Sequence, residues 1–137
     1  MIGIYHSRDL DGYTSGAIMK LKYPDIKLIG FDYGQQFDFS LVKDGEPVIM
    51  ADVSLEMPDM LKMAEKSHWQ FTWIDHHISK INDYKNFVGE GEAFCKAVLD
   101  NNTSACEGAW KYLFPDKPMP RAILLLGEYD TWRNQDK

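Results

Sequence analysis

The stretch Trp73-Ile74-Asp75-His76-His77 decides the fold, because an apolar run stops there abruptly at one carboxylate and two imidazoles. A buried strand has this pattern when it delivers polar side chains to the rim of a sheet, where open α/β proteins bind ligands. Two other apolar runs stop in the same way, one at His6 and the other at Asp52. Three strands that end in Asp or His predict one polar site at the carboxyl end of the sheet.

The rest of the pattern predicts an α/β fold of three layers. Strand-like runs occupy residues 1–6, 26–31, 47–52 and 69–75, and residues 93–99 are either extended or helical. Helix-like segments run from a cap at Thr14 or Ser15 to Lys22, over about ten residues after Met57, from Ala105 to Leu113 and from residue 122. The alternation is typical of a mostly parallel, five-stranded sheet with helices on both faces. Residues 7–12 are expected to form a loop, residues 78–85 a short connector, and residues 87–89 an extended segment.

Composition restricts the class of protein. The 137 residues, 45% hydrophobic and 26% charged, fit one globular domain, and no run approaches the roughly 20 apolar residues that span a bilayer. The apolar run at the start of the sequence is too short, and charged residues follow it too soon, for a signal peptide. A net charge of −6 without a Lys/Arg cluster argues against a protein that coats long nucleic acid. Cys95 and Cys106 lack CxxC spacing, which favours reduced thiols and a cytoplasmic location.

Metal-ligand chemistry is concentrated at the predicted strand ends. Asp9-Leu10-Asp11-Gly12 places two carboxylates two residues apart, and Gly12 allows a tight turn or a close backbone approach. Carboxylates with imidazoles, and without thiolates, suit manganese, magnesium, cobalt or zinc. Either motif alone is weak evidence, since Asp-x-Asp usually marks a solvated turn and adjacent histidines often have no role. Their joint placement favours a metal site.

The motifs taken in order resemble those of a known family. His6-x-x-Asp9-x-Asp11-Gly12, then Asp52, then Asp75-His76-His77, then Asp130 within Glu128-Tyr129-Asp130-Thr131-Trp132, are similar to the four motifs of the DHH phosphoesterase superfamily. The resemblance extends from residue 5 to residue 132. The family includes single-strand exonucleases, oligoribonucleases that also dephosphorylate small nucleotides, cyclic-dinucleotide phosphodiesterases and family II inorganic pyrophosphatases.

The resemblance implies two catalytic divalent cations, most often manganese, with magnesium or cobalt as alternatives. It implies that His6 and Asp9 hold one cation, that Asp11, His76 and Asp130 hold the other, and that Asp52 bridges both. Asp75 would orient an imidazole and raise its basicity. His77 would face the substrate phosphate or the leaving oxygen. Catalytic roles would thus fall to Asp52, Asp75 and His77, with a hydroxide activated by the two cations as the attacking group.

Two further features could meet a phosphate. Arg8 and Arg133 flank expected ligand positions and could contact phosphate oxygens, although solvated arginines on loops would look the same. Ser104 precedes an expected helix and could present backbone N–H groups to an anion, or it could be an ordinary N-cap.

The expected function is hydrolysis of a phosphate ester or phosphodiester in a nucleotide or short oligonucleotide. DHH enzymes usually carry a second, C-terminal domain with a glycine-rich motif that contains histidine, and no histidine follows His77 here. Residues 1–137 are therefore expected to be either a compact single-domain member or a piece of a longer two-domain enzyme. The alternative function is a non-catalytic module that binds a nucleotide or a partner. A missing C-terminal domain, or a second copy in a homodimer, would then complete the cleft.

Overall fold

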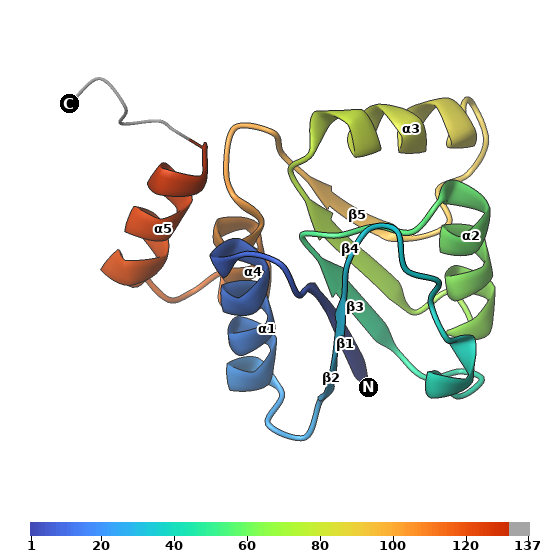
Figure 1. Ribbon diagram of the computed structural model, residues 1–137, viewed down its shortest axis with the longest axis horizontal. Helices are drawn as coiled ribbons and strands as arrows, with labels where there is room; N and C mark the ends of the chain where they lie inside the picture. The colour runs from blue at the N-terminus through green and yellow to red at the C-terminus, as the bar shows by residue number, and fades with distance from the viewer. Residues whose placement is uncertain (132–137) are drawn as a thin grey trace.

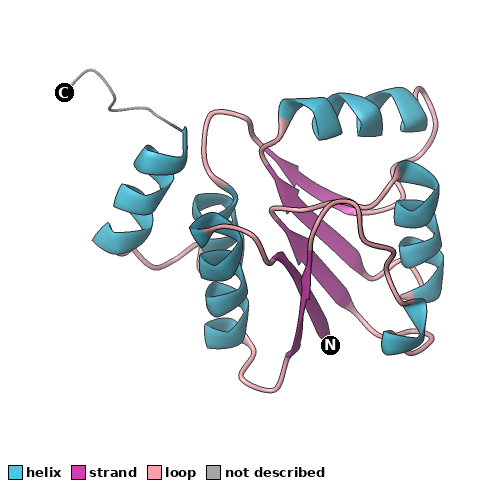
Figure 2. Cartoon of the chain, viewed as in Figure 1, coloured by secondary structure: helices cyan, strands magenta, loops and turns pink. Residues whose placement is uncertain are grey.

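The predicted sheet is confirmed in a computed structural model, which describes residues 1–131. Its five strands are β1 (Ile2–His6), β2 (Lys27–Phe31), β3 (Val48–Ala51), β4 (Phe71–Asp75) and β5 (Lys96–Leu99). They lie in the order β2-β1-β3-β4-β5, and every neighbouring pair is parallel (Figure 2). None of the helices within residues 1–131 is long and apolar enough to cross a membrane.

Helices cover both faces of the sheet, as the sequence predicts. They are α1 (Leu10–Lys22), α2 (Met57–Lys66), α3 (Ile78–Val88), α4 (Ala105–Leu113) and α5 (Arg121–Thr131), with a short 3-10 turn at Phe39–Leu41. Helices α2 and α3 lie on one face, and α1 and α4 lie on the other (Figure 1). Helix α5 packs against α1 and α4 at the side of the molecule.

Each face of the sheet has its own core because successive strand residues point to opposite sides. Val48 and Met50 join the cluster under α2 and α3, whereas Ile49 and Ala51 join the cluster under α1 and α4. All four residues of β3 are consequently buried, which is the continuous apolar pattern of a strand covered on both faces.

The strand order places the carboxyl ends of β1 and β3 at a topological switch point. The chain leaves β1 in one direction to reach β2 and later returns on the other side to form β3. In open α/β sheets, ligands bind in the crevice at such a point. His6 is the last residue of β1, and Asp52 directly follows β3.

Helix α1 begins earlier than predicted, which corrects both the loop expected through Gly12 and the cap expected at Thr14 or Ser15. Asp9 is the N-cap, and its Oδ1 accepts a 2.8 Å hydrogen bond from the backbone N–H of Gly12. A Cβ at Gly12 would collide with the carbonyl oxygen of His6. The missing side chain therefore lets the first turn of α1 lie directly against the end of β1.

The segment predicted as a connector is helix α3, and Phe87-Val88-Gly89 ends this helix and is not extended. Its buried stripe is sparse, with Ile81 and Tyr84 as the buried residues. Tyr84 packs edge-to-face on Trp73, with ring centroids 5.6 Å apart. The chain leaves the helix at Gly89, whose φ of 56° suits a residue without a side chain.

Candidate metal centre

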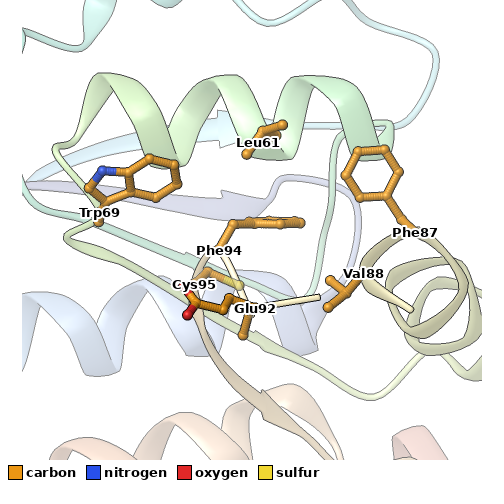
Figure 3. A pocket seen from close by; sticks show the side chains of 8 residues that line it. Leu61, Trp69, Phe87, Val88, Glu92, Phe94 and Cys95 are labelled. Carbon is orange, nitrogen blue, oxygen red and sulfur yellow. The ribbon is translucent and has the colours of Figure 1, made fainter. Parts of the chain in front are cut away.

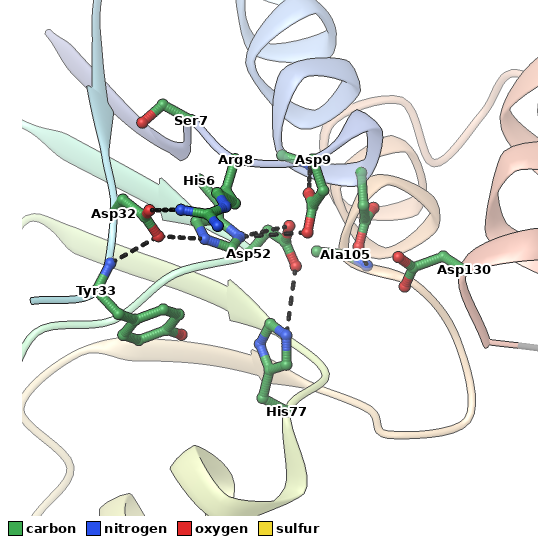
Figure 4. Close-up of polar contacts among 12 residues, drawn as sticks. His6, Ser7, Arg8, Asp9, Asp32, Tyr33, Asp52, His77, Ala105 and Asp130 are labelled. Carbon is green, nitrogen blue, oxygen red and sulfur yellow. Dashed lines mark hydrogen bonds and ion pairs between the residues drawn. The ribbon is translucent and has the colours of Figure 1, made fainter.

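The six residues predicted to hold cations lie together at the carboxyl end of the sheet, in two groups of three. One group is His6, Asp9 and Asp52, and the other is Asp11, His76 and Asp130. Within each group, one potential ligand atom from each residue lies within 4.8 Å of the others. Figure 4 shows His6, Asp9 and Asp52 on one side and Asp130 on the other. A third possible group joins Asp52 and His76 to Asp75 and His77.

Asp52 lies between the two groups. Its Oδ2 is 3.5 Å from Nδ1 of His6, and its Oδ1 is 3.1 Å from Nε2 of His76. The residue is fully buried and has a φ of 65°, a left-handed conformation uncommon outside glycine. One carboxylate oxygen therefore faces each group.

In the first group, two buried atoms make no hydrogen bond within residues 1–131. They are Nδ1 of His6 and Oδ2 of Asp52, and both lie near the carboxylate of Asp9. Oδ1 of Asp9 caps α1, which leaves its Oδ2 at 3.4 Å from Nδ1 of His6. Because a buried polar atom without a partner costs about 1–3 kcal/mol, this arrangement suits a ligand that such atoms could bind.

Asp32 holds the far side of the His6 ring, and the sequence analysis missed it. Its Oδ1 lies 2.9 Å from Nε2 of His6, and this hydrogen bond is the main cause that lowers the pKa of Asp32. The signal was present, because Asp32 follows the apolar strand β2 just as Asp52 follows β3. Arg8 contacts the other oxygen of Asp32 at 3.4 Å, and its side chain is 77% exposed. Arg133 lies outside the described residues.

In the second group, helix α4 fixes the carboxylate of Asp11. The backbone N–H groups of Ala105 and Cys106 donate to its two oxygens at 3.1 and 2.7 Å. Ser104 is the ordinary N-cap of α4 and forms a capping box with Glu107. The anion at this helix N-terminus is therefore Asp11 itself, where a carboxylate is favoured by the helix dipole.

His76 joins the second group to Asp52. Its Nε2 lies 3.3 Å from Oδ2 of Asp11 and 3.6 Å from Oδ2 of Asp130. Asp130 comes from α5, which packs closely on α4. The absence of a side chain at Gly127 permits this contact, since a Cβ there would overlap the buried carboxylate of Glu107. The position of Asp130 thus depends on contact between two helices that are adjacent in sequence.

Asp75 holds His77 in place. Its buried Oδ1 accepts a 2.7 Å hydrogen bond from the backbone N–H of His76 and lies 2.7 Å from Nδ1 of His77. With Nδ1 engaged, Nε2 of His77 faces Asp52 at 4.0 Å, and 36% of the side chain is exposed. Asp75 therefore orients an imidazole, as predicted, and that imidazole is His77.

Crowded carboxylates perturb the pKa values of the site. Burial, with the nearby charges of Asp11 and Asp9, raises the pKa of Asp52 to about 9. Burial, with the charge of Asp11, also raises the pKa of Asp130 to about 6. Burial opposes the charged forms of His76 and Asp11, but hydrogen bonding outweighs burial for both residues. Contacts with Asp11 and Asp52 raise the pKa of His76 to about 10. Hydrogen bonds with His76 and with the backbone of Cys106 lower the pKa of Asp11 to about 2. Protons thus offset part of the negative charge, a role that cations can also fill.

A separate hollow of about 570 Å³ lies at the amino end of the sheet. It is lined mainly by apolar side chains, including Leu61, Trp69, Phe87 and Phe94 (Figure 3). None of the predicted site residues lines it. The candidate metal centre and this apolar hollow are therefore distinct features.

Comparison with known proteins shows the fold alone. No family model matches the chain, and no curated protein matches it. A crystal structure of an uncharacterized protein from Helicobacter pylori G27 is similar, with a TM-score of 0.75 and 18% identity over 98% of this chain. The chain spans 44% of the length of that protein.

Proposed function

We propose that the chain is a metal-dependent phosphoesterase of the DHH type, which hydrolyses a phosphate ester or phosphodiester of a nucleotide or short oligonucleotide in the cytoplasm. The position of Asp52 is the observation that carries this proposal. It is a fully buried carboxylate in the first group of possible metal ligands, where its Oδ2 faces His6. Its Oδ1 faces His76 of the second group. Such a residue suits a bridge between two cations.

The donor atoms fit hard divalent cations. His6, Asp9 and Asp52 would hold one ion, and Asp11, His76 and Asp130, with Asp52 shared, would hold the other. Oxygen and imidazole donors without thiolates suit manganese, magnesium or cobalt. When bound, two such cations supply positive charge against the phosphate and increase the acidity of water.

The side chain of His77 suits a role toward the substrate. Asp75 holds its Nδ1, so its Nε2 is the nitrogen free to exchange a proton on the open side of the site. An imidazole held in this way can donate a proton to the leaving oxygen. Asp75 fixes the orientation of the ring, so that Nε2 stays on the open side of the site.

The test is manganese-dependent hydrolysis of a substrate panel by the purified chain. The panel contains short RNA, a 3′,5′-bisphosphate nucleotide, a cyclic dinucleotide and pyrophosphate. We expect turnover of at least one nucleotide substrate that is lost in excess chelator. Two bound manganese ions with no turnover of any substrate would instead favour the non-catalytic nucleotide- or partner-binding module.

Two variants separate the proposed roles. Asp52→Ala should abolish hydrolysis and manganese binding together, because both ions would lose a ligand. His77→Ala should slow hydrolysis by about 10²–10⁴-fold, the range typical for loss of a general acid, and retain both ions. Calorimetric manganese titration alongside turnover measures both effects. The assignment is wrong if His77→Ala loses the ions and Asp52→Ala retains them.

A further inference from the structure

A hollow of about 420 Å³ lies beside the candidate metal centre, between the loop after β2 and the start of α2. Tyr33 lines this hollow and also faces the centre. Its ring centroid is 5.4 Å from that of His6 and 6.4 Å from that of His77, and Figure 4 shows the ring next to both residues. A molecule with its phosphate at the centre would therefore reach the hollow past Tyr33.

One wall of the hollow is aromatic. Phe31, Phe37 and Phe39 pack edge-to-face in sequence, with centroids 5.9 and 5.2 Å apart. Ser54, a residue that is 2% exposed, also lines the hollow beside the Tyr33 phenol, and its hydroxyl makes no hydrogen bond within residues 1–131. A flat ring could contact this wall and still find a polar partner.

The lining of the hollow also offers hydrogen-bond acceptors that the protein itself does not use. Glu56 is the N-cap residue of α2, yet its side chain makes no capping bond, and Asp59 follows one turn later. Neither carboxylate makes a hydrogen bond or ion pair within residues 1–131, and the same is true of the Gln36 amide. Lys62, the one cationic residue in the lining, has its ammonium over the Phe39 ring at 4.3 Å. The acidic wall would repel a second phosphate and attract N–H groups.

We infer that this hollow binds the nucleobase of the substrate and prefers guanine. The inference rests on the proposed function, because the phosphate of the same molecule would lie at the metal centre. Proteins read an unpaired base by stacking on its face and by hydrogen bonds to its edge. Guanine presents a ring N–H beside an amino group, which matches a carboxylate acceptor, whereas adenine has no ring N–H on that edge. Uracil also has a ring N–H on that edge, but carbonyl oxygens flank it in place of an amino group, and Glu56 and Asp59 would repel them.

The test uses metal-free protein and nucleosides, which lack phosphate. Titration with guanosine, followed by amide NMR and calorimetry, should shift resonances of residues 33–37 and 54–59. Adenosine and uridine should bind about tenfold more weakly or worse, the scale expected for loss of one hydrogen bond to a charged group. Glu56→Gln should weaken guanosine binding by a similar factor. Glu65→Gln is the matched control, because Glu65 is exposed on the same helix and does not line the hollow.

The outcomes keep this inference separate from the proposed function. Absence of guanosine binding, equal affinity for the three nucleosides, or unchanged binding by Glu56→Gln would overturn the guanine site. Guanosine binding without manganese-dependent hydrolysis of any panel substrate would support the guanine site and contradict the proposed phosphoesterase activity. Hydrolysis with no preference among bases and no nucleoside binding would support the enzyme and overturn the guanine site.

Discussion

At the carboxyl end of the sheet, carboxylates and imidazoles are buried against one another, whereas at the amino end aromatic rings surround an apolar hollow. His6, Asp52 and Asp75 are nearly inaccessible at the first end, and each keeps a side-chain atom without a hydrogen bond in the described chain. Phe94 is equally buried at the second end, but its ring packs on Tyr84 and Phe87 with centroids 5.2 and 6.0 Å apart. The comparison teaches that packed apolar rings stabilise one end, whereas unsatisfied polar atoms cost stability at the other, a relation that is common at functional sites.

The largest expected effect on stability lies at the amino end. Phe94→Ala should lower the free energy of unfolding by about 3–5 kcal/mol, because it removes a buried ring and leaves a cavity. Urea unfolding measures the loss, and manganese affinity of the folded variant should not change. Phe87→Ala is the control, since Phe87 is 45% exposed and should lose clearly less. Equal losses would show that Phe94 is not a central packing residue.

A substitution at the carboxyl end should have the opposite effect and raise the free energy of unfolding. Asp52→Asn should raise the metal-free free energy of unfolding by about 1–3 kcal/mol, the cost of an unsatisfied buried polar group. The amide avoids the cost of keeping the Asp52 carboxyl protonated beside Asp9 and Asp11, it can donate a hydrogen bond, and Asn tolerates the φ of 65°. Chelator-treated protein in urea unfolding tests this, and the variant should bind manganese poorly. A less stable variant would contradict the view that this end is under electrostatic strain.

The last difference is a pH dependence that should arise mainly at the carboxyl end. At pH values between the ordinary carboxyl pKa and about 9, folded Asp52 keeps a proton that the unfolded chain loses. His76 does the same from its ordinary value up to about 10, so the folded state binds more protons and its stability falls as pH rises. The lowered pKa of Asp11 acts in the opposite direction, but only below its ordinary value. Metal-free protein should therefore melt at a lower temperature at about pH 9 than at about pH 6. Manganese, which replaces the protons, should reduce this difference, and a flat metal-free profile would contradict the pKa values.

The sheet and the polar residues at its strand ends were predicted from the sequence for the same reason. Buried parallel strands are continuous apolar runs, and a run that stops at Asp52 or Asp75 marks its carboxyl end without any knowledge of the other strands. The start of α1 was missed because Asp9 has two functions: one oxygen caps the helix while the other faces His6. A residue that suits a metal site was not also recognised as an N-cap.

Other features depend on contacts that no local pattern contains. Helix α3 has few buried residues, and Tyr84 becomes a core residue only when Trp73 and Phe94 pack around it. The hydrogen bonds between α4 and Asp11 join residues more than 90 positions apart. Asp32 shows the pattern that identified the other strand ends, so its omission was an error of interpretation.

The placement of Asp130 gives helix α5 a further property. Asp130 is the penultimate residue of the helix, in the last turn, where backbone hydrogen bonds open most readily. If an ion binds to Asp130, fraying of this turn must release one of its ligands, and the free energy of binding is added to the free energy of local opening. Amide hydrogens in the last turn of α5 would then exchange with solvent more slowly as the ion concentration rises, while those of β3 in the core would not respond. The end of this helix would thus report occupancy of the second group through its rate of hydrogen exchange.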